Sequence, residues 1–336
     1  MAGGSKLAVY AAIGANSVVT VAKFAGFALT GSGAMLSEGI HSTADVGNQV
    51  LLAVGMRRAA KPADDEHPGG YGREAFVWAL ISAVGIFFLG CGVTIMHGIE
   101  SLAHPHTEHE DQTVNLAILA FAFFAEGATL LIATRSLLAQ ARERGIGFVE
   151  HLRTTDDPFG VAVLLEDSAA VLGVLLAAVS VGLSALTHEP YWDGLGSIAI
   201  GVLLGCVAVF LIWKNTQLLV GRAVHVTDRE AIRALLEKEP AVERVVEQRA
   251  LVTGAETMRI SAELDFDGRY FAERYLESHD LAAITERVSG DPVALRAFLA
   301  EFGESVVNDV GDEVDRIEAR LRLAIPKASL IALEPD

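Results

Sequence analysis

Three ionisable residues follow one another along one apolar stretch of the chain: Glu38, His41 and Asp45. Spacings of three and then four residues place all three side chains on one face of an α-helix. An imidazole and a carboxylate four residues apart can bind one divalent cation. Ionisable groups at membrane depth normally face a polar interior and mark a path for ions or protons. The alternative is that polar contacts only hold this helix against its neighbours, and we favour the cation path.

A second acidic pair, Glu166 and Asp167, lies in another apolar run. If that run enters a membrane from the cytoplasm, Asp167 lies about 10–12 Å inside it, since a helix rises 1.5 Å per residue. Asp45 falls near the middle of its own run, so the two carboxylates can meet at mid-membrane, with His41 one turn further out. An imidazole combined with oxygen ligands suits Zn²⁺ and tolerates Mn²⁺, Fe²⁺ or Co²⁺.

Other ionisable residues in the apolar runs belong to a candidate proton path or lie behind the metal ligands. Glu126 is a carboxylate at membrane depth and a candidate proton carrier. Lys23 either pairs with such an acid or extends its stem toward the membrane surface. Asp193, at the outer mouth of the last run, guides ions or caps its helix. Glu38 joins this group, and a purely structural role stays open for each residue.

Apolar residues are concentrated in six segments, each close to the ~20 residues that cross a bilayer. They cover residues 7–30, 34–56, 75–99, 113–134, 160–186 and 194–213. This pattern predicts a bundle of six transmembrane helices within residues 1–220.

The basic residues between these segments predict the orientation of the bundle. Two of the connecting loops are basic, through Arg57, Arg58, Lys61, Arg73, Arg142, Arg144 and Arg153. The loops around 31–33, 100–112 and 187–193 contain neither Lys nor Arg. Because basic loops stay in the cytoplasm, both termini are predicted to be cytoplasmic.

Composition narrows the function further. The chain has 336 residues, is 51% hydrophobic and carries a formal charge of −17, which argues against nucleic acid as a partner. Its two cysteines, Cys91 and Cys206, lie in apolar runs and predict neither a disulfide framework nor a thiolate metal cluster. We expect no cleaved signal peptide, because the run after Lys6 is too long for a signal core.

Residues 221–336 have the pattern of a water-soluble α+β domain. The periodicity predicts two helices and three strands, in the order Asp228–Glu239 (helix), Val242–Val252 (strand), Thr257–Phe266 (strand), Val314–Leu323 (helix) and Lys327–Leu333 (strand). Residues 270–302 form an extra helical segment with a break at 289–292. The order of elements predicts a ferredoxin-like, metallochaperone-like sandwich.

Four motifs together resemble the cation diffusion facilitator family of metal transporters. They are T-G-S-G-A-M-L-S-E-G-I-H-S-T-A-D (30–45), H-P-G-G-Y-G-R-E (67–74), P-Y-W-D-G-L-G-S-I-A-I (190–200) and P-K-A-S-L-I-A-L-E-P-D (326–336). Leu164–Asp167 and the span before it are similar to the branch that contains a mitochondrial zinc exporter. The resemblance covers the whole chain except the extra segment.

This resemblance implies a homodimeric divalent-cation/proton antiporter with a tetrahedral central site. Two ligands would come from the second span, His41 and Asp45, and two from the fifth, of which Asp167 is one. The position four residues before Asp167 is Val163, which cannot ligate. Glu166, which points about 100° away around the helix, is the candidate fourth ligand. The alternatives are a rotated or unwound fifth helix, Glu38 and a water molecule.

We therefore predict a secondary transporter, not an enzyme, that exports divalent cations from the cytoplasm in exchange for protons. Zn²⁺ is the predicted cargo, Cd²⁺, Co²⁺, Fe²⁺ and Mn²⁺ are further candidates, and no bound cofactor is expected. The alternatives are a divalent-cation channel and a carrier selective for Mn²⁺, Fe²⁺ or Co²⁺. The predicted location is a prokaryotic plasma membrane, with the lipid bilayer and a second copy of the chain as partners. The soluble domain holds only His225 and His279, so no metal site is predicted there.

Overall fold

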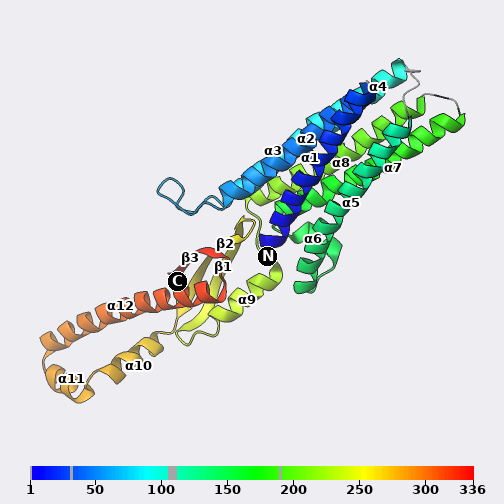
Figure 1. The fold of residues 1–336 in the computed structure, drawn as a ribbon. Coiled ribbons are helices and arrows are strands. Elements are labelled where there is room, and N and C mark those ends of the chain that lie inside the picture. Colours follow the sequence, from blue (N-terminus) through cyan, green and yellow to red (C-terminus); the bar gives the residue numbers. More distant parts are fainter. Residues whose placement is uncertain (1, 31–32, 105–111, 188, 190) are drawn as a thin grey trace. The chain divides into compact units, whose positions relative to one another are not determined.

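The computed structural model describes residues 2–30, 33–104, 112–187, 189 and 191–336 (Figure 1). They form two compact units, one holding the chain up to Val220 and the other holding Gly221–Thr253 and Thr257–Asp336. The chain passes between the two at Gly221, whose φ of 112° favours glycine because a Cβ would be strained there.

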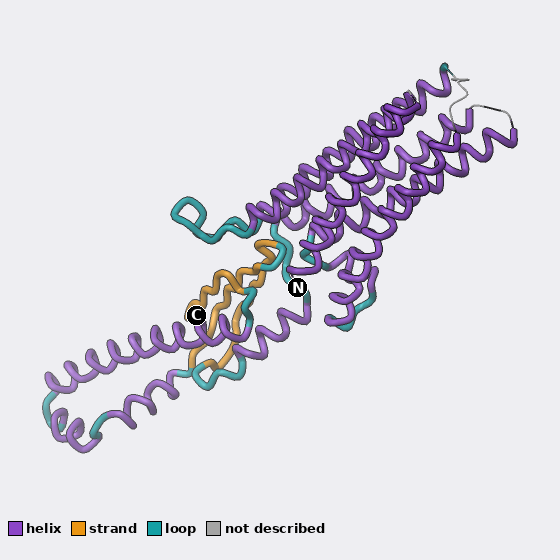
Figure 2. The backbone as a smooth tube through the Cα atoms, in the orientation of Figure 1, coloured by secondary structure: helices purple, strands orange, loops and turns teal. Residues whose placement is uncertain are grey.

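The first unit is built from long helices that run alongside one another (Figures 1 and 2). In chain order its elements are α1 (Ala2–Thr30), α2 (Gly33–Ala59), α3 (Glu74–Gly85), η1 (Ile86–Gly92), α4 (Val93–Ala103), α5 (Gln112–Glu143), α6 (Phe148–Thr154), α7 (Pro158–Thr187) and α8 (Tyr191–Val220). Helix α1 packs against α2, α5 and α7, while α8 packs against α3, α4 and α7. The short helix α6 was not predicted from the sequence.

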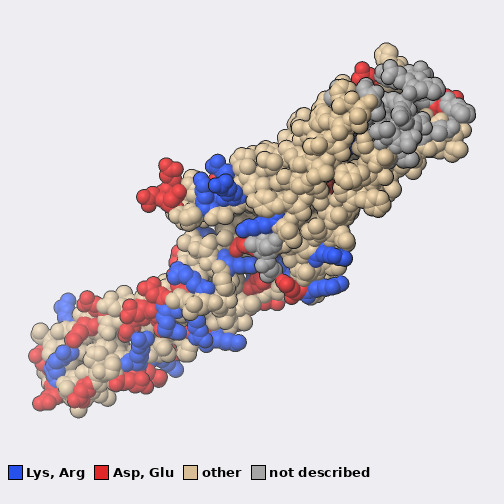
Figure 3. All heavy atoms as spheres, viewed as in Figure 1, with Lys and Arg blue, Asp and Glu red and all other residues tan. Residues whose placement is uncertain are grey.

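Large apolar side chains cover the outside of this bundle. Leu29, Phe124 and Leu186 are among the most exposed of them. In Figure 3 the long helices present mainly uncharged side chains, and Lys and Arg gather at the end of the bundle that carries the N-terminus. A helix bundle that is apolar on the outside is stable in a bilayer rather than in water.

Five helices of the described chain are long and apolar enough to cross a membrane. They are Gly4–Leu29, Glu74–Ala103, Ala120–Glu143, Pro158–Ser184 and Tyr191–Val220. Helix α2 is not among them, because its ionisable and hydroxyl side chains lower its apolar content. The predicted count of six therefore depends on whether α2 also crosses.

The third apolar segment is not a regular α-helix throughout. Between α3 and α4 the backbone widens into a π-helix at η1, which the sequence reasoning did not predict. Its Gly90 packs beside Leu204 of α8, where an added Cβ would lie 3.5 Å from that side chain. Wide turns of this kind are frequent at functional sites.

The second unit combines a three-stranded sheet with helices. Its elements are α9 (Val226–Leu236), β1 (Val242–Gly254), β2 (Thr257–Phe266), α10 (Gly268–Ser278), α11 (Leu281–Val288), α12 (Pro292–Ala324) and β3 (Ala328–Pro335). The strand order is β1-β2-β3, and β3 runs parallel to β2 with Ile260 opposite Ile331. Both of these residues are buried, as are Ile232 of α9 and Ile317 of α12, so these helices contribute to one apolar core with the sheet.

The extra segment differs from its prediction in one respect. The predicted break is present, since α11 ends at Val288, Gly290 has a φ of 75° and α12 begins with Pro292 at its first turn. The expectation that the segment ends near 302 and that a separate helix begins at 314 is wrong. Helix α12 runs without interruption over both, because the face with Ile317 and Leu321 anchors its last turns in the core.

Candidate metal centre

A polar cavity lies among the helices of the first unit. Its volume is about 120 Å³, well above the ~10–15 Å³ that one water molecule needs. Polar or ionisable side chains of α1, α2, α5 and α7 form half of its wall, namely Asn16, Lys23, His41, Asp45, Asn48, Gln49, Glu126, Glu166 and Asp167. The other half is apolar and includes Ile86 at the start of the π-helix and Leu204 of α8.

Helix α2 contributes one stripe of this wall. His41, Asp45, Asn48 and Gln49 lie at helical positions i, i+4, i+7 and i+8, which share one face. The Nε2 atom of His41 is 3.9 Å from Oδ2 of Asp45. Two ligand atoms on a tetrahedral Zn²⁺, each about 2.0–2.1 Å from the metal, lie about 3.3 Å apart. A small side-chain rotation therefore converts this pair into two ligands of one ion.

Helix α7 contributes the acidic side opposite. Asp167 is 2% exposed and Glu166 is half-buried. Asp45 lies close enough to both for a direct electrostatic interaction. Oδ2 of Asp167 and Oε1 of Glu166 are shielded from solvent and accept no hydrogen bond from the described residues. Buried acceptors are normally paired. Because these two oxygens are not, they are available to bind a cation.

Two further ionisable side chains of the prediction line the same cavity. The Nζ of Lys23 donates a hydrogen bond of 2.7 Å to the Oγ of Ser42, and Glu126 is buried on α5. The structure thus brings together six of the eight residues selected from the sequence.

The remaining predicted residues lie elsewhere. Asp193 does not line the cavity; it is exposed at the start of α8 and accepts a bond of 3.4 Å from Ser101. The side chain of Glu38 lies outside the described residues. Val163 is fully buried and is not part of the cavity wall, so it leaves the fourth ligand position to another group.

Sequence reasoning missed Asn48, Gln49 and Ser82 as parts of this site. Ser82 of α3 lies beside Glu166 and points its hydroxyl at the carbonyl of Asn48, 3.4 Å away. Asn48 and Gln49 carried a usable signal, because they continue the helical stripe that begins at His41. Ser82 carried none, since its place depends on how α3 packs against α2 and α7.

The cavity is not a finished coordination shell. Within the described part of the chain, no three His, Cys, Asp or Glu side chains lie close enough together to hold a metal ion. Four carboxylates that share one small space repel each other, which keeps them apart until a cation draws them together. Binding of an ion would therefore move α2 side chains toward those of α7.

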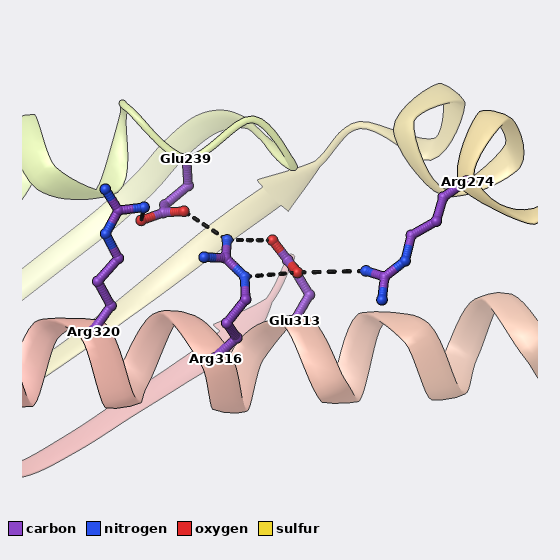
Figure 4. Close-up of polar contacts among 5 residues, drawn as sticks. All are labelled: Glu239, Arg274, Glu313, Arg316 and Arg320. Carbon is purple, nitrogen blue, oxygen red and sulfur yellow. Dashed lines mark hydrogen bonds and ion pairs between the residues drawn. The ribbon is translucent and has the colours of Figure 1, made fainter. Parts of the chain in front are cut away.

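A second charged cluster, in the other unit, offers a contrast (Figure 4). Glu239 and Glu313 are buried there, and Arg316 donates to both, at 2.6 Å and 3.0 Å. Arg320 and Arg274 add ion pairs of 3.0 Å and 3.7 Å to the same two carboxylates. The pKa of Arg316 is raised by its hydrogen bonds to the two acids. With each acid paired, this cluster stabilises the fold and leaves no oxygen for a metal.

Comparison with known proteins finds a family model and relatives that cover most of this chain. A model of the cation efflux transmembrane domain matches residues 9–220. The human proton-coupled zinc antiporter SLC30A9, mitochondrial, is 38% identical over 328 residues, which are 97% of this chain and 58% of the antiporter. Metal tolerance protein C4 of Arabidopsis thaliana is 36% identical over 337 residues, 98% of this chain and 73% of that protein.

A bacterial relative is more distant. The cation-efflux pump FieF of Shewanella oneidensis is 25% identical over 265 residues, which are 78% of this chain and 82% of the pump. The chain thus spans less than two thirds of the length of the human antiporter but most of the length of the bacterial pump.

Proposed function

Because the chain belongs to the cation efflux family, which is the cation diffusion facilitator family that its motifs resemble, we propose that it exports divalent metal cations in exchange for protons. It is an integral membrane protein with several apolar helices and a small C-terminal sheet domain. Zn²⁺ is the proposed cargo, because the human relative is named a zinc antiporter. Mn²⁺, Fe²⁺, Co²⁺ and Cd²⁺ are the further cations that its ligand types accept.

One observation carries this proposal. Unpaired carboxylate oxygens of α7 face a cavity of about 120 Å³ whose opposite wall bears His41 and Asp45. A metal binds the ionised carboxylate and the neutral imidazole, so loading displaces whatever protons the empty site holds. Metal and protons then occupy one site in turn, which is the requirement for exchange.

The proposed ligands are His41, Asp45 and Asp167, with Glu166 as the fourth. Glu166 is favoured over a water molecule because its free oxygen lies in the same cavity as that of Asp167. Glu126 and Lys23 are proposed to govern charge around the ion. A role for Asp193 or Glu38 on the path to the site stays a proposal from the sequence alone.

For the architecture we propose six membrane-crossing helices within residues 1–220, with α2 and α7 as the helices that carry the metal ligands. Residues 221–336 form the proposed cytoplasmic domain, ferredoxin-like in the order of its elements, and both termini are cytoplasmic by the distribution of Lys and Arg. A homodimer through this domain is the proposed assembly. The expectation of a prokaryotic plasma membrane finds no support in the SLC30A9 relatives, whose names are mitochondrial.

Flux measurements in liposomes test the function directly. The purified full-length chain is reconstituted, and Zn²⁺ uptake is followed with an internal dye at several imposed pH gradients. Exchange requires that uptake scales with the gradient and that internal pH changes with zinc entry. Zinc flux that is independent of the pH gradient and far exceeds the turnover of a carrier would instead indicate a channel. A panel of Mn²⁺, Fe²⁺, Co²⁺ and Cd²⁺ in the same assay ranks the cargo.

A further inference from the structure

The wall of the cavity contains a cation of its own. Among the described residues that line it, Lys23 is the only Lys or Arg. It lies in the last third of α1, is 6% exposed, and reaches Ser42, the residue directly after His41 on α2. Its ammonium group therefore lies inside the bundle and does not extend to the membrane surface.

A buried ammonium group needs nearby negative charge to offset the loss of its hydration. The same cavity supplies up to four carboxylates, those of Asp45, Glu126, Glu166 and Asp167. A metal ion that enters the cavity therefore meets a fixed positive charge in the same wall as these acids. Repulsion between this charge and the ion acts over a short distance in a medium of low dielectric constant, where it is strong.

The charges in the cavity limit the number of divalent ions that it can hold. Four ionised carboxylates would accept two divalent ions if no other cation were present. One divalent ion together with Lys23 brings three positive charges against four negative ones, whereas a second divalent ion would leave an excess of positive charge.

We propose that Lys23 is a resident cation of the metal cavity, a proposal that rests on the proposed function. Its charge restricts the cavity to one divalent ion and weakens the binding of that ion. Weaker binding favours release on the far side of the membrane, so Lys23 sets occupancy and turnover. It is a positioning residue that does not touch the cargo.

Binding measurements on the detergent-purified full-length chain, with Zn²⁺ as the only added ligand, test this proposal. Lys23→Gln removes the charge and keeps a polar group for Ser42, while Lys23→Arg keeps the charge. Lys214→Gln is the matched control, because Lys214 is also a buried lysine of the same unit but is not part of the cavity wall. Calorimetric titration and metal analysis after dialysis give the affinity and the number of ions per chain.

We expect Lys23→Gln to bind its first Zn²⁺ at least ~10-fold more tightly than the wild type, or to bind two ions per chain. Lys23→Arg and Lys214→Gln should bind as the wild type does. In transport, Lys23→Gln should lower both KM and kcat because release becomes slow. A Lys23→Gln protein that is monodisperse and folded, yet binds one Zn²⁺ with unchanged or weaker affinity, overturns the proposal and leaves Lys23 a structural link between α1 and α2.

A further variant separates this result from the proposed function. Asp45→Ala with Asp167→Ala should abolish zinc binding if the cavity is the metal centre. If the double variant loses zinc binding while Lys23→Gln binds zinc as the wild type does, only the role of Lys23 is rejected. Retained binding in the double variant would reject the metal centre itself.

Discussion

The imidazole Nε2 of His41 lies 3.9 Å from the carboxylate Oδ2 of Asp45, one helical turn away on α2. This separation is too long for a hydrogen bond between them and close to the spacing of two ligands on one Zn²⁺. Their side chains are 31% and 42% exposed, so an ion can reach both of them. Across the cavity, Asp167 has an unpaired oxygen.

The first prediction concerns these ligands. Asp45→Asn keeps the size and polarity of the side chain but removes the charge that a divalent cation requires. Loss of one direct ligand should exceed the ~10–100-fold effect of removing an outer partner, so we expect Zn²⁺ affinity to fall by more than ~100-fold. Calorimetric titration measures this change.

Glu100→Gln is the control for Asp45→Asn. Glu100 is an exposed carboxylate of α4 in the same unit and is not part of the cavity wall. Its replacement should leave the affinity unchanged. Equal losses in both variants would mean that general negative charge, and not coordination, holds the ion.

The sequence predicts those features of the site that one helix determines. It does not predict those that depend on how several helices pack. The α2 stripe follows from the helical period alone, so the shared face of His41 and Asp45 was predictable. The position of Glu166 was not, because the spacing around α7 places it about 100° from Asp167. Only the packing of the neighbouring helices shows that both residues border one cavity.

The misjudged parts of the fold have a similar physical origin. Gly303 and Gly311 weaken the local helix propensity of α12, but burial of Ile317 and Leu321 outweighs them. The π-helix at η1 also depends on contacts with α8 that local sequence does not specify.

Close helix packing yields a second prediction. A Cβ added at Gly194 would lie 2.8 Å from the carbonyl oxygen of Gly98 and 2.7 Å from Cγ of Leu102. Gly194→Ala should therefore push α8 away from α4 and destabilise the unit by about 1–3 kcal/mol. Thermal unfolding in detergent measures the change. Gly127→Ala is the control, since a Cβ there meets nothing within 4 Å and helix propensity alone should stabilise it slightly.

A third prediction concerns Arg316 and the charged cluster of the second unit. Arg316→Met leaves the buried carboxylates of Glu239 and Glu313 with only their weaker partners. Breaking one side of a buried ion pair is strongly destabilising, and with these partners retained we expect a loss of about 2–4 kcal/mol in the free energy of unfolding. Chemical denaturation of the full-length chain measures it.

The matched arginine on the same helix is Arg322. It pairs at 3.1 Å with Glu318 at the surface, and an exposed pair contributes only about 0–1 kcal/mol. Arg322→Met should therefore have little effect. If Arg316→Met and Arg322→Met unfold at the same denaturant concentration, the buried cluster contributes nothing beyond a surface pair.

The last prediction is a pH dependence that arises at His151 in the short helix α6. This side chain is 0% exposed, and neither ring nitrogen has a hydrogen-bond partner within the described structure. Burial lowers the pKa of His151, the positive charges of Arg144 and Lys214 lower it further, and Asp157 partly opposes them. The folded protein therefore holds the neutral imidazole, while the unfolded chain takes up a proton near pH 6.5.

Between the folded and unfolded pKa values the unfolded state binds more protons, so stability is present above about pH 6.5 and is lost as the pH falls below it. The slope from one such group is at most about 1.4 kcal/mol per pH unit. His151→Gln removes this group, so the difference in unfolding temperature between the wild type and the variant should narrow from pH 7.5 to pH 5. His279→Gln replaces an exposed histidine of the other unit and is the control for the loss of a histidine side chain. A difference between wild type and His151→Gln that stays constant over this range would show that His151 does not link protonation to folding.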